Sequence, residues 1–245
     1  MIPKIVHYCW FGQSRMPIKL KRNIETWKKM NPDFTFIEWN ERNFDIQLAN
    51  NFVKEAYRNR EWAFVSDYVR LYVIYKYGGF YFDTDVKLLK KLDDVEKTFP
   101  NGFMGFQNNE FVNSGLGIAS KSGSEIIKEM LEIYNHNKFA VNKKIDFACP
   151  IINTQVLKKY GLIQNNSMQL IKEITILPTE YLSPITLSEG KKKVTKNTIA
   201  IHEYNGSWMK WTLRLRMRFI LFIKKLLPNS VVQVVKRMYK EKKDD

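Results

Sequence analysis

Apolar and polar residues alternate along the chain in a pattern that predicts strands and helices in turn. Residues 3–11 are a β-branched and aromatic run that closes at Gly12, which is typical of a buried strand. Apolar residues then recur at helical spacing over residues 18–30, and a second strand is predicted at residues 34–39 after an Asn-Pro helix stop. This β-α-β start favours a mostly parallel sheet covered by helices.

The same alternation continues further along the chain. A helix predicted at residues 62–77 is followed by two glycines, a pair that ends helices. The other expected helices cover residues 44–59, 124–134 and 151–160, and the other expected strands cover residues 80–89, 117–119, 174–177 and 198–202. The sequence contains no internal repeat, so this pattern predicts one α/β domain over residues 1–209.

The pattern changes after residue 209. On a helix of 100° per residue, five basic side chains fall in one sector and apolar side chains occupy the rest, apart from Arg216. The basic residues are Lys210, Arg214, Arg218, Lys224 and Lys225. The apolar run is too short and too basic to span a bilayer, so we expect residues 210–245 to be a separate amphipathic helical segment on an anionic membrane surface. The alternative is that its apolar face packs on the preceding domain.

The composition is that of a folded protein. Of the 245 residues, 44% are hydrophobic and 14% are aromatic, which excludes a disordered or low-complexity chain. The two cysteines, Cys9 and Cys149, belong to no C-x-x-C pair, so we expect a reduced compartment and no structural zinc. The first residues lack the basic start and long apolar run of a signal peptide. The expected location is cytoplasmic, peripheral on the inner face of the membrane.

The chain is strongly basic, with a formal net charge of +15. Residues 210–245 hold 11 basic and 3 acidic residues, so they carry +8 and the preceding domain carries +7. A nucleic-acid-binding protein would more often spread this charge over its binding face, whereas a basic tail indicates attachment to a surface. We therefore expect no nucleic-acid partner and keep a nucleic-acid-binding protein as the less favoured alternative.

A charged pair lies on an otherwise apolar helix. The helix at residues 62–77 is apolar nearly all round except for Ser66, Asp67 and Arg70. Asp67 and Arg70 are three residues apart and so share a face, and a buried charge is costly unless it pairs or meets a ligand. The pair is either an internal salt bridge or part of a binding site.

Two further carboxylates, Asp83 and Asp85, follow the glycine pair and a run of strand residues. In a regular strand, alternate residues face the same side, so these two carboxylates would share one face. Two hard carboxylates suit Mg²⁺ or Mn²⁺ bridging to a diphosphate, and ligands of open α/β sheets gather at the carboxyl ends of strands. The alternative for such a motif is a turn or a solvated edge.

Three blocks of sequence, in order, resemble one family of enzymes. They are IPKIVHYCWFG at the start, AFVSDYVRL with YGGFYFDTDV in the middle, and AIHEYNGSW at residues 200–208. They resemble the DXD-containing glycosyltransferases of family 32, which include capsular polysaccharide sugar transferases and yeast mannosyltransferases, and are more distantly similar to the glucosylating domain of large clostridial toxins. The resemblance spans roughly residues 2–209. It implies a GT-A fold, a single nucleotide-sugar-binding α/β domain.

The resemblance implies a site for a nucleotide-sugar donor. The candidate residues for contacts with its base, ribose, sugar or diphosphate are Trp10, Ser66, Asp67, Arg70, Asp83, Asn113, Ser207 and Trp208. Trp10 would stack on the base, with a core tryptophan as the alternative. Ser207 and Trp208 would close over the diphosphate and leaving group. All except Trp10 and Ser66 are also candidates for a catalytic role.

The resemblance also implies a site for Mn²⁺ or Mg²⁺. Asp85 would be one ligand, and a residue of the last block would be another. Glu203 stands five residues before Trp208, as a metal-ligating Glu does in the toxin relatives. His202 competes with Glu203, because only one of two neighbouring strand residues faces the site. His7, in its apolar strand, is expected to be a core residue whose hydrogen bonds are made within the protein, or a residue that supports the site without touching its ligand.

These features predict a metal-dependent, retaining glycosyltransferase. It would move a hexose from a nucleotide-sugar, with a UDP-sugar favoured, to an oligosaccharide or lipid-linked glycan acceptor in the synthesis of surface polysaccharide such as capsule. Retention is implied by the resemblance, and no protein nucleophile is needed if the acceptor attacks from the leaving-group side. A metal-dependent sugar-nucleotide hydrolase or phosphotransferase is the alternative, because it would use the same carboxylates.

Overall fold

The computed structural model describes residues 1–186 and 191–204, so Ser207, Trp208 and the predicted segment 210–245 lie outside the described residues. The described residues belong to two compact units. The first is Met1–Pro184 with Val194–Tyr204. In the second, two short strands, β10 (Ile185–Thr186) and β11 (Lys191–Lys192), pair antiparallel. The domain boundary expected at residue 209 stays a prediction.

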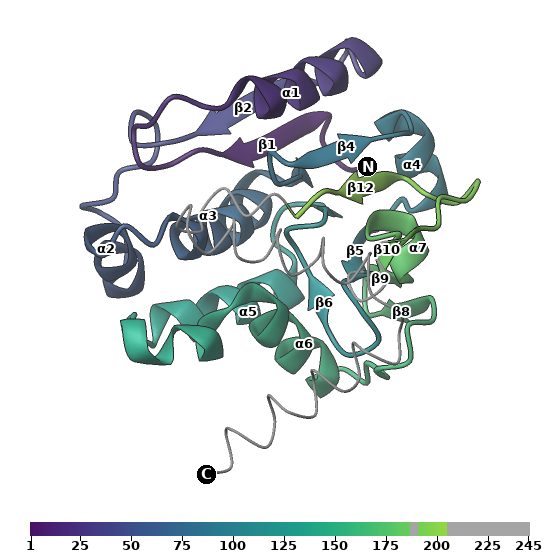
Figure 1. The fold of residues 1–245 in the computed structure, drawn as a ribbon. Helices are drawn as coiled ribbons and strands as arrows, with labels where there is room; N and C mark the ends of the chain where they lie inside the picture. The colour runs from purple at the N-terminus through teal and green to yellow at the C-terminus, as the bar shows by residue number, and fades with distance from the viewer. Residues whose placement is uncertain (187–190, 205–245) are drawn as a thin grey trace, which may run out of the picture. The chain divides into compact units, whose positions relative to one another are not determined.

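An eight-stranded sheet forms the centre of the first unit (Figure 1). Its strands follow the order β2 (Thr35–Trp39), β1 (Ile5–Cys9), β3 (Gly79–Tyr81), β7 (Ile118–Ser120), β5 (Gly102–Phe106), β9 (Ile174–Leu177) and β8 (Gln169–Ile171), and β6 (Val112–Asn113) pairs with β5. The pairings make β2, β1, β3, β5 and β9 run one way and β6, β7 and β8 the other. The predicted α/β fold with a largely parallel central sheet is confirmed.

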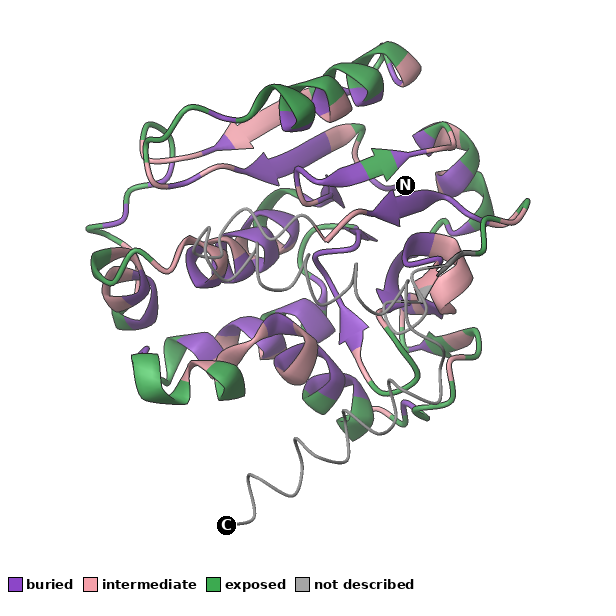
Figure 2. Ribbon diagram, in the orientation of Figure 1, coloured by how far each residue is buried: buried purple, intermediate pink, exposed green. Residues whose placement is uncertain are grey.

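Helices cover both faces of this sheet. One face packs on α2 (Asn51–Arg58), α3 (Trp62–Tyr77), α5 (Glu125–Asn135) and α6 (Cys149–Lys159), and the other on α1 (Ile18–Met30), α4 (Leu92–Thr98) and α7 (Thr179–Leu182). Side chains of β3 alternate between the two cores, with Tyr81 in the first and Phe80 in the second. Burial on both faces explains why the central strands are continuous apolar runs (Figure 2).

The connection from α3 to β3 depends on the glycine pair. Gly78 ends α3 with a φ of +67°, and Gly79 has a φ of +99°, a backbone region that side chains with a Cβ rarely adopt. A Cβ on Gly79 would lie 2.6 Å from the carbonyl oxygen of Ile5. The pair therefore allows β3 to lie close beside β1 and brings the end of β3 to the site.

The predicted strand at residues 80–89 is wrong as a single element. The strand β3 ends at Tyr81, a turn follows, and β4 (Val86–Leu88) pairs antiparallel with β12 (Ala200–His202) in a separate two-stranded sheet. The N–H of Val86 donates to the carbonyl of Asp83 at 2.9 Å and closes the turn. Aspartate favours such turns, so the DXD motif lies after the strand and not within it.

The helix predicted at residues 44–59 is shorter in the structure. It begins at Asn51, because the side chain of Asn50 accepts the N–H of Val53 at 2.9 Å and caps the helix. A 3₁₀ helix, Val141–Phe147, precedes α6. Within residues 1–186 and 191–204, no helix is long and apolar enough to cross a bilayer.

Candidate active site

The DXD turn lies at the carboxyl end of β3, next to the end of β12. The N–H of Phe82 donates to the carbonyl of His7 at 3.3 Å, which continues the contact between β3 and β1. The carbonyl of Asp85 accepts the N–H of Glu203 at 3.1 Å. In the ladder of β4 and β12, His202 stands opposite Val86. These backbone contacts bring the last sequence block beside the two aspartates.

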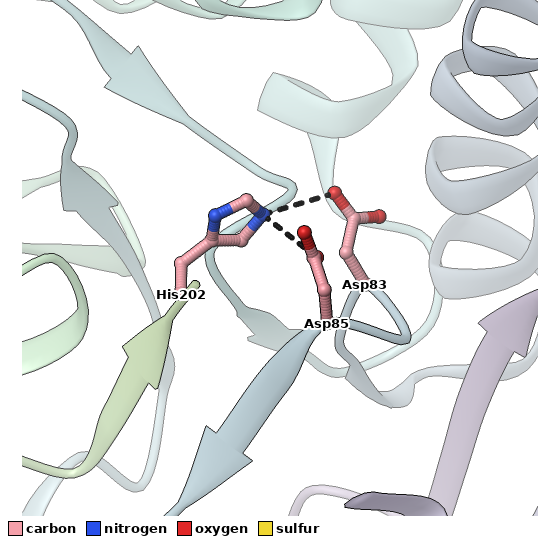
Figure 3. A group of neighbouring side chains, drawn as sticks. All are labelled: Asp83, Asp85 and His202. Carbon is pink, nitrogen blue, oxygen red and sulfur yellow. Dashed lines mark ion pairs between the residues drawn. The ribbon is translucent and has the colours of Figure 1, made fainter. Parts of the chain in front are cut away.

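Asp83, Asp85 and His202 form a group that fits a divalent cation (Figure 3). The Nε2 atom of His202 lies 3.2 Å from Oδ1 of Asp85 and 3.6 Å from Oδ2 of Asp83. One ligand atom from each of the three residues lies within 4.8 Å of the others. Carboxylate oxygens with one imidazole nitrogen are a donor set for Mn²⁺ or a related divalent metal.

Glu203, the competing candidate, points elsewhere. Its carboxylate lies 2.7 Å from Nζ of Lys19 on α1. Neighbouring residues of a strand point to opposite sides, and at the end of β12 the side that faces the aspartates belongs to His202. The geometry thus groups His202 with Asp83 and Asp85 and leaves Glu203 outside that group.

Tyr204 contacts the ring of His202 and its Nδ1, the ring nitrogen that does not face the aspartates. The N–H of Tyr204 donates to Nδ1 of His202 at 3.2 Å, and the two rings lie 4.3 Å apart in an edge contact. The Tyr204 hydroxyl is 2.7 Å from Oγ of Ser183. Burial lowers the pKa of His202, but the charges of Asp85 and Asp83 outweigh burial, so this pKa is raised.

Arg70 is buried between two carboxylates. Its Nη1 lies 3.0 Å from Oδ1 of Asp67, and its Nη2 lies 2.7 Å from Oδ1 of Asp83. The guanidinium also lies over the ring of Tyr81, 4.9 Å from its centroid. The charged pair on α3 is therefore joined to the DXD turn, and Arg70 fixes one oxygen of Asp83 while the other faces His202.

The two carboxylates beside Arg70 have different acidities. Burial raises the pKa of Asp67 to about 6, against the attraction of Arg70. Burial acts in the same direction on Asp83, but there Arg70 and His202 outweigh it and lower the pKa to about 2. Asp83 therefore stays ionised at neutral pH, as a group that meets a cation must.

Cys149 belongs to this site, although no sequence motif marked it. Its backbone N–H donates to Oδ2 of Asp67 at 3.2 Å, and its Sγ lies 3.2 Å from Nη1 of Arg70 and 3.1 Å from Oδ1 of Asn113. Cys149 and Cys9 are both buried and free, so neither forms a disulfide. Burial raises the pKa of the Cys149 thiol, which suits a packing group better than a nucleophile.

Asn113 holds the loop that lies against the DXD turn. Its Oδ1 accepts the N–H of Gly115 at 2.7 Å, and its Nδ2 donates to Oε1 of Gln107 at 2.6 Å. The side chain is buried, and most of its hydrogen-bonding capacity is used within the protein. Asn113 lies next to the residues that are candidates for binding the nucleotide-sugar donor, and its own hydrogen bonds fix the conformation of its loop.

Gly115→Ala is expected to disturb the metal group. An added Cβ would lie 2.5 Å from Oδ2 of Asp83, so the carboxylate would have to move. We expect Mn²⁺ affinity to fall about tenfold or more, the effect of displacing a group that orients a ligand. Gly123→Ala is the control, because nothing lies within 4 Å of its added Cβ, although its φ of +77° adds a backbone strain that Gly115→Ala does not have. Equal Mn²⁺ affinity of both variants, measured by titration, would contradict the geometry.

Tyr204→Phe is expected to weaken metal binding more than stability. The change removes the hydroxyl contact with Ser183 and frees the ring that packs on His202. Loss of such an outer contact reduces metal affinity by about 10- to 100-fold, whereas one hydrogen bond contributes about 1 kcal/mol to folding. Tyr160→Phe, which removes a hydroxyl bonded to Glu129, is the control. The same Mn²⁺ affinity for both variants would remove Tyr204 from this role.

The remaining candidates lie at the same edge of the sheet or on α3. Trp10 is half-buried at the carboxyl end of β1, and its indole N–H donates to the carbonyl of Ser14 at 2.7 Å. Ser66 is half-buried beside Asp67. His7 is fully buried between the indole N–H of Trp39 and the carbonyl of Gly78, and burial lowers its pKa to about 4. His7 is the satisfied core residue that was predicted.

Residues 17–100 match the family described as "Glycosyltransferase sugar-binding region containing DXD motif". These residues are therefore similar to the sugar-binding region of DXD-containing glycosyltransferases. The matched residues include α3 with Asp67 and Arg70, and the turn with Asp83 and Asp85. The resemblance predicted from the sequence blocks is confirmed.

Three similar proteins have names that describe them as sugar transferases. The chain is 28% identical over 119 residues to inositol phosphoceramide mannosyltransferase 3 of Schizosaccharomyces pombe, covering 43% of this chain and 33% of that protein. It is 24% identical over 217 residues to O-glycosyltransferase braB of Annulohypoxylon truncatum, covering 75% and 49%. It is 27% identical over 155 residues to lactosylceramide 4-alpha-galactosyltransferase of Mus musculus, covering 58% and 40%. The chain thus spans at most about half the length of these relatives.

Two solved structures share the fold. The PaToxG glycosyltransferase superposes with a TM-score of 0.52 at 20% identity, covering 64% of this chain and 68% of that chain. A glycosyltransferase involved in glycosylation of the major capsid of PBCV-1 has a TM-score of 0.50 at 11% identity, covering 89% of this chain and all of that one. These likenesses support a glycosyltransferase fold.

Proposed function

We propose that the protein is a metal-dependent glycosyltransferase that transfers a hexose from a nucleotide-sugar to a glycan acceptor. The observation that carries this proposal is the group of Asp83, Asp85 and His202, whose ligand atoms lie within 4.8 Å of one another, in and beside the matched sugar-binding region. Asp85 and His202, with Oδ2 of Asp83, would hold Mn²⁺ or Mg²⁺. When bound, such a cation neutralises charge on a leaving diphosphate.

The protein's own groups have separate tasks in this proposal. Arg70 keeps Asp83 ionised and in place, and Asp67 holds Arg70 from the other side. Asp67, Arg70 and Asp83 are proposed to contact the donor's sugar and ribose, because their polar groups meet at the carboxyl end of β3. Ser66 on α3 would support the donor, and Asn113 would hold its loop around the sugar. Ser207 and Trp208 are proposed to close over the diphosphate.

Trp10 is proposed to stack on the nucleotide base. It lies at the end of β1, the strand next to β3, and is half-buried rather than enclosed in the core. Trp10→Ala should weaken nucleotide binding by about 1–3 kcal/mol, the range for a base stacked on a protein aromatic. Fluorescence titration with UDP measures this. Unchanged affinity with a lower Tm would make Trp10 a packing residue.

The acceptor is proposed to be a lipid-linked glycan of a surface polysaccharide such as capsule. Two of the relatives have ceramide acceptors in their names, which favours a glycan on a lipid. A UDP-sugar donor, a retaining course and a cytoplasmic site at the inner face of the membrane belong to the same proposal. Residues 210–245, outside the described residues, are proposed to add a membrane contact.

Donor screening with product analysis tests the function. The full chain is melted with UDP-, GDP-, CMP- and dTDP-sugars in the presence of Mn²⁺, because only a ligand that binds the folded protein raises the Tm by mass action. The donor that raises it is then incubated with a glycolipid acceptor. We expect a glycosylated product and free nucleoside diphosphate. Free sugar alone would identify a hydrolase, transfer of a phosphoryl group would identify a phosphotransferase, and either would overturn the proposal.

A further inference from the structure

The positive charge of residues 1–209 is concentrated on one short stretch. Residues 15–29 hold six Lys or Arg residues and one Glu, so they carry +5, whereas all the other residues up to 209 carry +2 together. The six basic residues are Arg15, Lys19, Lys21, Arg22, Lys28 and Lys29, and all are exposed. Lys19 pairs with Glu203, and Lys28 lies 3.7 Å from Glu25. Charge of one sign on one element indicates an anionic partner.

Most of these residues lie on α1, whose inner side is fixed to the candidate active site. Leu20, Ile24 and Trp27 are buried in the core shared with the sheet. The indole N–H of Trp27 donates to the carbonyl of Val86, and the side-chain amide of Asn23 donates to the carbonyl of Thr84 in the DXD turn at 3.2 Å. The helix thus touches the turn with its inner side and presents its basic side outward, as the exposed outer side of α1 in Figure 2 shows.

The same stretch borders a cavity and carries an exposed apolar residue. A cavity of about 320 Å³ is lined by Arg15, Lys21 and Lys28, and also by Trp10, Glu25 and Glu38. Because Trp10 is the residue proposed to stack on the nucleotide base, this cavity belongs to the proposed donor site, and the exposed residues of α1 are the part available to a membrane. Ile18, at the first position of α1, is 64% exposed among the basic residues. Basic residues around an exposed apolar side chain are typical of helices that lie on a lipid surface.

We propose that the exposed face of α1 binds the phosphate headgroups of an anionic lipid bilayer and so holds the DXD site near the bilayer, where a lipid-linked acceptor lies. The benefit of such binding, access to a lipid-linked acceptor, rests on the proposed function. The binding itself is inferred only from the charge and exposure of the residues on α1. Attraction to an anionic leaflet increases with each basic residue near the surface and decreases as salt is added. The contact is separate from the one proposed for residues 210–245.

Vesicle binding by the full chain tests the proposal. Vesicles of phosphatidylcholine, with and without phosphatidylglycerol, are sedimented with the wild type and two triple variants. The first, Lys21→Glu/Arg22→Glu/Lys29→Glu, reverses charge on α1. The second, Lys121→Glu/Lys128→Glu/Lys138→Glu, reverses three exposed lysines elsewhere in the same unit and is the matched control. Both variants change the net charge equally and retain residues 210–245.

We expect the α1 variant to lose about tenfold or more in affinity for the anionic vesicles, and the control variant to stay close to the wild type. Adding inositol phosphate tells whether a soluble phosphate competes for the same face. Three results would overturn the proposal. An equal loss of binding in both variants would show that net charge alone acts. Unchanged binding by the α1 variant would exclude α1 as the binding face, and tighter binding of single-stranded DNA than of vesicles would indicate a nucleic-acid partner.

If the α1 variant does not fold, as judged by circular dichroism, Lys21→Gln/Arg22→Gln/Lys29→Gln replaces it. Vesicle binding needs no turnover, so failure of the glycosyltransferase assay is a separate result.

Discussion

Asp85→Asn is expected to abolish metal-dependent turnover while the protein stays folded. The amide keeps the volume of the carboxylate but removes the charge that faces His202 at 3.2 Å. Loss of one fixed electrostatic group in an active site lowers the turnover rate by about 100- to 1000-fold. The Tm should stay close to that of the wild type, because loss of the attraction to His202 is offset by loss of the repulsion from the neighbouring Asp83. Donor turnover at limiting Mn²⁺ and thermal melting measure the two effects.

Asp93→Asn is the control for this substitution. The Asp93 side chain is 39% exposed and pairs with Lys4 at the surface, so its amide variant should keep both rate and Tm. Rates near those of the wild type for Asp85→Asn, at limiting Mn²⁺, would mean that this carboxylate does not serve the metal. A large fall in Tm would mean that it serves the fold.

Arg70→Lys is expected to lose most of the activity and part of the stability. The guanidinium binds Asp67 with one nitrogen and Asp83 with the other, and a single ammonium cannot reproduce this fork. One buried carboxylate would lose a charge-assisted hydrogen bond, which contributes about 1.5–3 kcal/mol. We expect the free energy of unfolding in denaturant to fall by about this amount and turnover to fall by about 100-fold.

Arg58→Lys provides the comparison. Arg58 also pairs with a carboxylate three residues away on a helix, but its side chain is 69% exposed. An exposed pair contributes less than about 1 kcal/mol, so this variant should be close to the wild type in both measurements. Full activity of Arg70→Lys would make the Asp67–Arg70 pair an internal salt bridge, which is the alternative that the sequence left open.

The elements with strong periodicity could be predicted from the sequence. The bounds of α1, α3 and β9 match those of the predicted segments, because their apolar spacing and their end signals agree. The strands β5 and β6 and the short helix α7 were not predicted. Gly102–Phe106 is a run of apolar residues and glycine without alternation, and four residues of α7 are too few to show a period.

The candidate site could be predicted only where its residues are close in sequence. Asp67 with Arg70 and Asp83 with Asp85 stand out locally, because charges interrupt apolar segments. The choice of His202 over Glu203 depends on the register of β12 against β4, a long-range pairing. The place of Cys149 depends on the contact of the first residue of α6 with Asp67 and Arg70 of α3, and no local pattern indicates that contact. Such contacts follow from the tertiary fold, so sequence spacing alone does not reveal them.

Mn²⁺ binding by His202→Ala and Glu203→Ala separates the geometry described here from its closest rival. Free Mn²⁺ is followed by electron paramagnetic resonance as the full chain is added in the presence of UDP. Because His202 faces Asp85 and Asp83 while Glu203 faces Lys19, we expect His202→Ala to lose about 10- to 100-fold in Mn²⁺ affinity and Glu203→Ala to bind as the wild type does. Loss of binding in Glu203→Ala with wild-type affinity in His202→Ala would contradict the assignment of the metal group to Asp83, Asp85 and His202.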